Sequence, residues 1–147
     1  MASAQPKPDI ETSLWIARPP EEMWEYWYDV SNEPQWRSGV ISSRWTSDPP
    51  YGVGSTGVHV VQGPSDWPWQ VTGWEDLRNI SWEITGGRFE GAHIGYRLAP
   101  ENAGSRVTIH LRVKPSVFTR ILIPVVRPWM RGQFAGDLER LKAIMEA

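Results

Sequence analysis

The strongest constraint on the fold lies near the C-terminal end of the chain. Large apolar side chains recur there at Met130, Phe134, Leu138, Leu141 and Met145. This spacing places them on one stripe of an α-helix with 3.6 residues per turn. Burying each of them is favourable by at most about 1.5–3 kcal/mol, and only if a partner surface is present. The rest of the chain must therefore supply a broad apolar surface for this helix to cover.

The middle of the chain predicts a sheet that supplies this surface. Six β-rich segments are separated by short connectors rich in Gly, Pro, Asp and Asn, which predicts an antiparallel meander. They span residues 40–45, 55–62, 69–75, 80–85, 92–98 and 106–113.

Alternation in the last three segments predicts which side chains face the core. The inward set is Ile80, Trp82, Ile84, Ala92, Ile94, Tyr96, Leu98, Val107, Ile109, Leu111 and Val113, and the outward set is Glu83, His93, Arg97, His110 and Arg112. Residues 55–75 alternate less clearly, and only Trp69 and Val71 are predicted to face inward there.

The start of the chain predicts one more strand and two short helices. Residues 1–8 are polar and contain two prolines, so we expect a disordered tail before a single domain over 9–147. Alternation predicts a strand over 10–16, and Pro20 with two following glutamates predicts a helix over 20–28. A very short helix is expected at 33–36, with Asp29, Ser31 or Asn32 as a cap before it.

Glycine and proline shape the approach to the C-terminal helix. Pro115, Pro124 and Pro128 predict a short helical piece and a bend before the main helix. Gly132 and Gly136 lie one helical turn apart, which predicts close packing of another element or space left for a ligand.

Composition excludes several classes of function. The net charge of -2, with scattered Lys and Arg, argues against nucleic acid as a partner. The absence of Cys removes disulfides and thiolate chemistry. No secretory signal or spanning segment is recognisable, so we expect a cytoplasmic protein without stable membrane insertion. His59, His93 and His110 lack metal-ligand spacing, and no Gly-x-Ser-x-Gly elbow occurs, so we predict neither a metal site nor a serine triad, and no cofactor.

Several segments together resemble a known family. They are IARPPEEMW at residues 16–24, then Asp29, Asn32, Pro34 and Trp36, GVGS at 52–55, YRL at 96–98 with GSRV at 104–107, and DLERLK at 137–142. Over residues 9–146 the chain resembles the polyketide cyclase/dehydrase group of the START-like (SRPBCC) superfamily. The resemblance implies an α+β helix-grip fold, in which a curved seven-stranded antiparallel sheet wraps round a long C-terminal helix. It also implies a deep apolar cavity between them, used by members for lipids, sterols, quinones or polyketides.

The candidate ligand-binding residues combine inward aromatics with polar groups on the helix stripe. Ten tryptophans are unusual in 147 residues, and their rings can fill a core or line a cavity. The candidates are Trp27, Trp69, Trp82, Ile84, Tyr96, Leu98, Ile109, Met130, Gln133, Phe134 and Asp137. Asp137 lies in the middle of the apolar stripe, where it can contact a ligand or satisfy a backbone amide or an arginine.

Three functions follow as hypotheses. The first is binding of a small hydrophobic, ring-containing molecule in an internal cavity. The second is a cyclase or aromatase that uses Asp137 and Tyr96 for proton transfer. The third is a chaperone-like module that binds protein through the outer face of the sheet. The residues leave open the choice between enzyme and carrier, the identity of the ligand and the oligomeric state.

Overall fold

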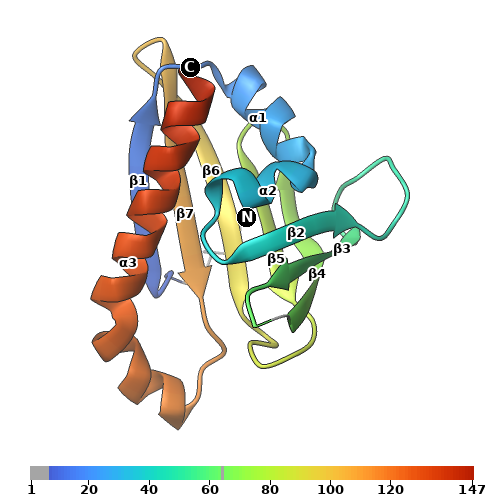
Figure 1. The fold of residues 1–147 in the computed structure, drawn as a ribbon, viewed down its shortest axis with the longest axis vertical. Helices are drawn as coiled ribbons and strands as arrows, with labels where there is room; N and C mark the ends of the chain where they lie inside the picture. Colours follow the sequence, from blue (N-terminus) through green and yellow to red (C-terminus); the bar gives the residue numbers. More distant parts are fainter. Residues whose placement is uncertain (1–6, 64) are drawn as a thin grey trace, which may run out of the picture.

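The computed structural model describes residues 7–63 and 65–147, and its centre is one antiparallel sheet (Figure 1). The strands are β1 (Ile10–Ile16), β2 (Val40–Trp45), β3 (Thr56–Val61), β4 (Ser65–Glu75), β5 (Asn79–Ile84), β6 (His93–Glu101) and β7 (Gly104–Arg112). Their order across the sheet is β1-β7-β6-β5-β4-β3-β2, which confirms the predicted meander. Most of the predicted tail, residues 1–6, lies outside the described residues.

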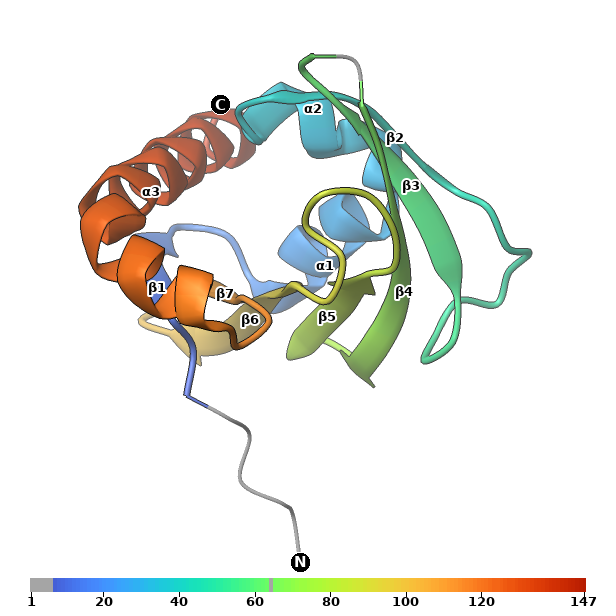
Figure 2. The same cartoon turned by 90° about the horizontal axis from the view of Figure 1, so that it is seen from below.

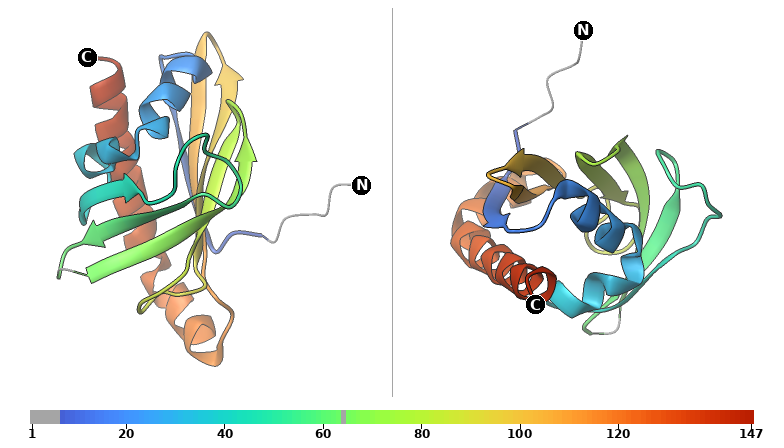
Figure 3. Two further views of the ribbon diagram at one scale, coloured as in Figure 1. Left: turned by 90° about the vertical axis from the view of Figure 1, so that its right-hand side faces the viewer. Right: turned by 90° about the horizontal axis from the view of Figure 1, so that it is seen from above.

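The sheet curls, and helices close its concave side. The helices are α1 (Pro20–Tyr28), the 3₁₀ turn η1 (Val30–Asn32), α2 (Glu33–Trp36) and α3 (Val117–Met145). Seen from below, the curled sheet, α3 and the short helices surround one interior (Figure 2). The long helix α3 packs mainly on β1 and α2 (Figure 3). This arrangement is the helix-grip fold that the sequence predicts.

The alternation of the strands places the core as predicted. Tyr96 pairs with Ile109 across β6 and β7, and Trp82 pairs with Ile94 across β5 and β6. All the predicted inward residues of these strands are buried except Ile94 and Val113, which are half-buried and pack against the core. Trp69 and Val71 are 3% and 1% exposed, so the two predictions made for the less regular segment are confirmed.

Local chemistry explains where the short helices begin. Pro20 is the first residue of α1, and the carboxylates of Glu21 and Glu22 lie at the positive end of the helix dipole. Asp29 caps η1 rather than α2, because its Oδ1 accepts the N–H of Ser31 at 3.1 Å. This chain of short elements turns the backbone across the open side of the sheet.

The predicted separate helical piece before α3 is wrong, because α3 is continuous from Val117 to Met145. A capping box starts it: the hydroxyls of Ser116 and Thr119 each accept the other residue's backbone N–H. Pro124 and Pro128 leave the carbonyls of Arg120 and Pro124 without helical partners, and both of these residues are exposed, so water can bond the freed carbonyls. The helix therefore curves near its start instead of breaking (Figure 1).

The two glycines of α3 do not mark close packing. A Cβ at Gly132 would have no neighbour within 4 Å, and one at Gly136 would meet only the Arg140 guanidinium at 3.8 Å. The prediction of a closely packed neighbouring element is therefore wrong for the described residues.

Candidate functional site

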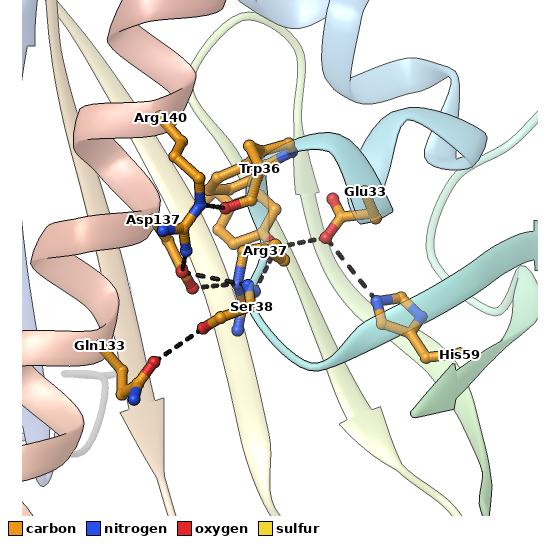
Figure 4. Close-up of polar contacts among 9 residues, drawn as sticks. Glu33, Trp36, Arg37, Ser38, His59, Gln133, Asp137 and Arg140 are labelled. Atoms are coloured by element: carbon orange, nitrogen blue, oxygen red, sulfur yellow. Dashed lines mark hydrogen bonds and ion pairs between the residues drawn. The ribbon is translucent and has the colours of Figure 1, made fainter. Parts of the chain in front are cut away.

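A network of polar side chains lies inside the curled sheet, among aromatic rings (Figure 4). It joins α2 and the loop after it, strands β3 and β6, and the C-terminal half of α3. Its most buried members are Glu33, His59, Tyr96 and Asp137, each at most 8% exposed. Polar groups this deep in a core require partners, so each of their contacts is informative.

Tyr96 links Glu33 to Arg37 at the centre of the network. Its hydroxyl donates to Glu33 Oε2 at 2.8 Å and accepts from Arg37 Nη1 at 2.5 Å. Burial raises the pKa of Tyr96 well above its ordinary value, and the Glu33 carboxylate adds to this while Arg37 opposes it. Burial alone lowers the pKa of Arg37, but Tyr96, Glu33 and Asp137 together raise it above its ordinary value. At neutral pH Tyr96 is therefore a proton donor beside a cationic guanidinium.

Asp137 holds α3 to the loop after α2. Its carboxylate accepts from Arg37 Nε at 3.0 Å and from the backbone N–H of Ser38 at 3.0 Å, and it also pairs with Arg140. Beside it, the Ser38 hydroxyl donates to Gln133 Oε1 at 2.9 Å. The two structural roles weighed for Asp137, an arginine partner and a backbone amide, are thus both present.

His59 projects from β3 and has one satisfied and one unsatisfied ring nitrogen. The indole Nε1–H of Trp69 donates to His59 Nδ1 at 2.6 Å. Because an indole can only donate, Nδ1 is unprotonated, and in the neutral ring the proton lies on Nε2. Nε2 is 3.8 Å from Glu33 Oε2 and has no hydrogen-bond partner among the described residues. The site therefore contains a buried N–H beside a carboxylate.

Gly57 makes this arrangement possible. It lies opposite Trp69 in the β3–β4 ladder, and a Cβ at Gly57 would lie 2.1 Å from a ring carbon of Trp69. Only glycine leaves room for the indole to lie across β3 and reach His59. The position of the His59 ring thus depends on the absence of a side chain two residues earlier on the same strand, β3.

The interior contains a cavity of ≈ 10 Å³, about the room for one water molecule. It is lined by Trp27, Val30, Glu33, His59, Trp69, Ile80, Trp82 and Tyr96. Aromatic rings fill the space around it: the ring centroids of Trp82 and Tyr96 are 4.9 Å apart, and those of Trp27 and Tyr96 are 5.1 Å apart. The deep apolar cavity implied by the resemblance is therefore occupied by side chains.

The structure gathers part of the predicted site and separates the rest from it. Four of the predicted residues line the cavity: Trp27, Trp69, Trp82 and Tyr96. Seven do not: Ile84, Leu98, Ile109, Met130, Gln133, Phe134 and Asp137. The cavity thus lies between the short helices and the sheet, whereas the resemblance implies one between the sheet and the C-terminal helix.

Four lining residues were not predicted: Val30, Glu33, His59 and Ile80. Ile80 was predicted to face inward but was not included in the site. The sequence indicates Glu33 only as part of a short helix, and His59 lies in the strand whose alternation is unclear. Gly57, Val58 and His59 are three successive buried residues, so period two fails in β3.

The other two histidines lie apart from His59. His93 and His110 are half-buried on the outer side of β6 and β7, as their parity predicts. Burial lowers the pKa of His110 to about 4, with the charge of Arg97 acting in the same direction. Within residues 7–63 and 65–147, no three His, Asp or Glu side chains are grouped closely enough to hold a metal ion. No helix in the described part of the chain is long and apolar enough to cross a membrane.

Solved structures share this fold at low sequence identity. A protein from Thermus thermophilus is 19% identical over 91% of this chain and 94% of its own, with a TM-score of 0.70. The Aha1 protein of Colwellia psychrerythraea, solved as a dimer, is 16% identical over 90% and 92%, with a TM-score of 0.66. The di-domain aromatase/cyclase StfQ of the steffimycin biosynthetic pathway is 15% identical over 91% of this chain and 49% of its own, with a TM-score of 0.67.

Among curated protein sequences, none matches this chain. The model of one protein family, described as "Polyketide cyclase / dehydrase and lipid transport", matches residues 7–146. This match covers nearly the whole chain and agrees with the segments that carry the resemblance in the sequence. The chain therefore belongs to the polyketide cyclase/dehydrase and lipid transport family, whose fold binds hydrophobic ligands.

Proposed function

We propose that this protein binds one small hydrophobic, ring-containing molecule of lipid, quinone or polyketide type between its short helices and the sheet. We further propose that an acceptor oxygen of this molecule takes the N–H of His59. The observation that carries the proposal is this buried, unpartnered N–H in a wall of aromatic rings, within the part of the chain that the structure describes. Family membership supports the hydrophobic class of ligand.

A second unpartnered donor lines the same cavity. The indole N–H of Trp27 is buried and has no partner among the described residues. Each buried donor without an acceptor costs about 1–3 kcal/mol. A ketone or quinone oxygen would satisfy such donors, while the rings of Trp69 and Trp82 would stack on a flat skeleton. The site therefore favours ligands with a carbonyl group over pure hydrocarbons.

Ligand binding requires side chains to move, because the free space is only ≈ 10 Å³. One wall of the cavity is Trp27, Val30 and Glu33 on the short elements, and the other wall is the sheet. The short elements are joined to the sheet by loops at both ends, whereas the sheet strands are held by ladders on both sides. Opening therefore takes place by displacement of the segment from α1 to α2.

A fluorescence titration tests the proposal. The wild type is titrated with quinones, sterols, fatty acids and aromatic polyketides, and a saturable change is expected for at least one carbonyl-bearing compound. Trp27→Phe keeps an aromatic ring but removes the N–H, so it should lower the affinity for that compound by roughly three- to tenfold. The same substitution should not change the binding of the deoxygenated analogue, in which a CH2 group replaces the carbonyl.

Trp24→Phe is the matched control for this titration. Trp24 also lies on α1, but it packs edge-on against Trp74 and does not line the cavity. It should leave the affinity at the wild-type value while removing the same number of indoles. Absence of a saturable response to every compound, or equal losses in both variants, would refute the proposal.

A cyclase or aromatase is the second candidate, and the pair of Tyr96 and Glu33 favours it. Both line the cavity. The Tyr96 O–H would turn from Glu33 to a bound ketone and protonate it, and Arg37, which donates to the phenol oxygen, would stabilise the phenolate left behind. Asp137, the other predicted proton-transfer group, is outside the lining. Tyr96→Phe should abolish turnover of an aromatic polyketide while binding persists. An unchanged turnover rate in this variant would eliminate Tyr96 as the acid.

A further inference from the structure

The N-terminal half of α3 exposes a continuous apolar face. The exposed side chains are Val117 (75%), Phe118 (69%), Ile121 (69%), Leu122 (38%), Val125 (73%) and Trp129 (66%). At 100° per residue they occupy one arc of about 140° on the helix. Ile123 and Phe134 lie on the opposite side and are buried. This helix thus has a second apolar face that the described part of the domain leaves uncovered, which we call the outer face of α3.

Positive charge accompanies the outer face. Residues 114–131 contain Lys114, Arg120, Arg127 and Arg131 and no acidic residue, although the whole chain has a net charge of -2. The remainder of the chain therefore carries -6. Arg120 and Arg131 are exposed and lie about 40–60° from the edge of the apolar arc. Arg127 donates to the backbone carbonyl of Asp9, which fixes its guanidinium close to the helix.

The outer face lies at one end of the molecule. The first turns of α3 project beyond the sheet at the lower end of Figure 1, and the turned view of Figure 3 shows the same projection. The loop between β5 and β6 reaches the same end and exposes Phe89 by 47%. The first turns of α3 and the β5–β6 loop therefore lie together at the end of the molecule that a flat surface would contact.

We infer that the outer face of α3 is a docking surface for a bilayer that contains anionic phospholipid. An amphipathic helix lies in the headgroup region when its apolar arc enters the acyl boundary and flanking cations remain among the phosphates. Trp129 suits that boundary, because its indole is apolar and carries one N–H donor. The contact is peripheral and requires no spanning segment, and it goes beyond the proposed ligand site.

The charge distribution favours a lipid surface over a second copy of the chain. Two outer faces packed together would bring Arg120 and Arg131 of both copies, four cationic side chains, close together without an acidic residue of 114–131 between them. Each cation instead gains by roughly 1 kcal/mol near an anionic membrane.

Vesicle co-sedimentation tests the inference with the full chain and no added ligand. The protein should bind vesicles of phosphatidylcholine with phosphatidylglycerol and should bind pure phosphatidylcholine at least roughly tenfold more weakly. The double variant Arg120→Gln/Arg131→Gln should lose roughly tenfold or more in affinity for the anionic vesicles. Ile121→Glu/Val125→Glu should lose at least as much, because the acyl contact is replaced by carboxylates.

Matched controls lie elsewhere on the surface. Val53 is 70% exposed in a loop, and Arg44 is exposed on β2, so Val53→Glu and Arg44→Gln should bind vesicles like the wild type. All variants should keep the wild-type unfolding transition, since none of the changed side chains is buried. Equal binding to both vesicle types, equal losses in the controls, or no vesicle binding at all would overturn the inference. Dimerisation in sedimentation equilibrium that Ile121→Glu/Val125→Glu abolishes, without vesicle binding, would also overturn it and assign the face to a second copy.

Discussion

The two halves of α3 belong to one helix but have opposite environments. In the C-terminal half, Phe134, Asp137, Leu138 and Leu141 are buried, and the carboxylate of Asp137 joins the helix to the loop after α2. In the N-terminal half most large apolar side chains face solvent. The amino-acid types are similar, so apolar content alone does not decide burial. Burial depends on whether the curled sheet reaches that part of the helix.

The largest predicted effect breaks the anchor of the buried half. Asp137→Ala should lower the free energy of unfolding by roughly 3–5 kcal/mol, because it leaves the buried guanidinium of Arg37 without its carboxylate. Glu139→Ala, an exposed position on the same helix, should change it by less than about 0.5 kcal/mol. Urea unfolding followed by circular dichroism measures both. Similar values for the two variants would contradict the role given to Asp137.

A second prediction compares the truncation of one apolar side chain to alanine in each half of α3. Leu138 is 1% exposed and Val125 is 73% exposed. Leu138→Ala should cost about 2–5 kcal/mol by leaving a cavity, whereas Val125→Ala should remain within about 0.5 kcal/mol of the wild type. Thermal unfolding of the two variants under one buffer condition provides the comparison. If Val125→Ala destabilised as strongly, the N-terminal half would have to be covered in solution.

The smallest predicted effect has the opposite sign. Gly132 has open space where a Cβ would lie, and it needs no unusual backbone conformation. Gly132→Ala should therefore stabilise the protein by about 1 kcal/mol through helix propensity alone.

Gly57→Ala is the contrasting control for that change. Its Cβ would lie 2.1 Å from the Trp69 ring, so this substitution should destabilise by roughly 1–3 kcal/mol. If Gly132→Ala and Gly57→Ala shifted the melting temperature in the same direction, the surroundings described for one of these glycines would be wrong.

Much of the fold can be predicted from the sequence, because apolar residues recur every two positions in half-buried strands and every 3.6 positions in half-buried helices. Tyr96, Trp82 and Ile109 alternate with polar neighbours, and each is buried. The apolar stripe from Phe134 to Leu141 likewise faces the sheet. These predictions succeed where one face of a helix or strand is buried and the other is exposed to solvent.

The site was harder to predict because its groups come from elements without a clear period. His59 lies in a strand with three successive buried residues, and Glu33 is in a helix of four residues. Asp137 was found from its place on the stripe, but its partners Arg37 and Ser38 are about a hundred residues away in the chain. The prolines of α3 do not break the helix, since the residues whose carbonyls they leave without partners, Arg120 and Pro124, are exposed to water.

The water-sized cavity among the aromatic rings also has a kinetic consequence. A molecule larger than water enters only after Trp27 and its neighbours on the short helices have moved. The observed association rate should then rise with ligand concentration at first and level off at the rate of opening. Dissociation of the ligand requires the same opening, so a modest equilibrium affinity would be accompanied by a long residence time.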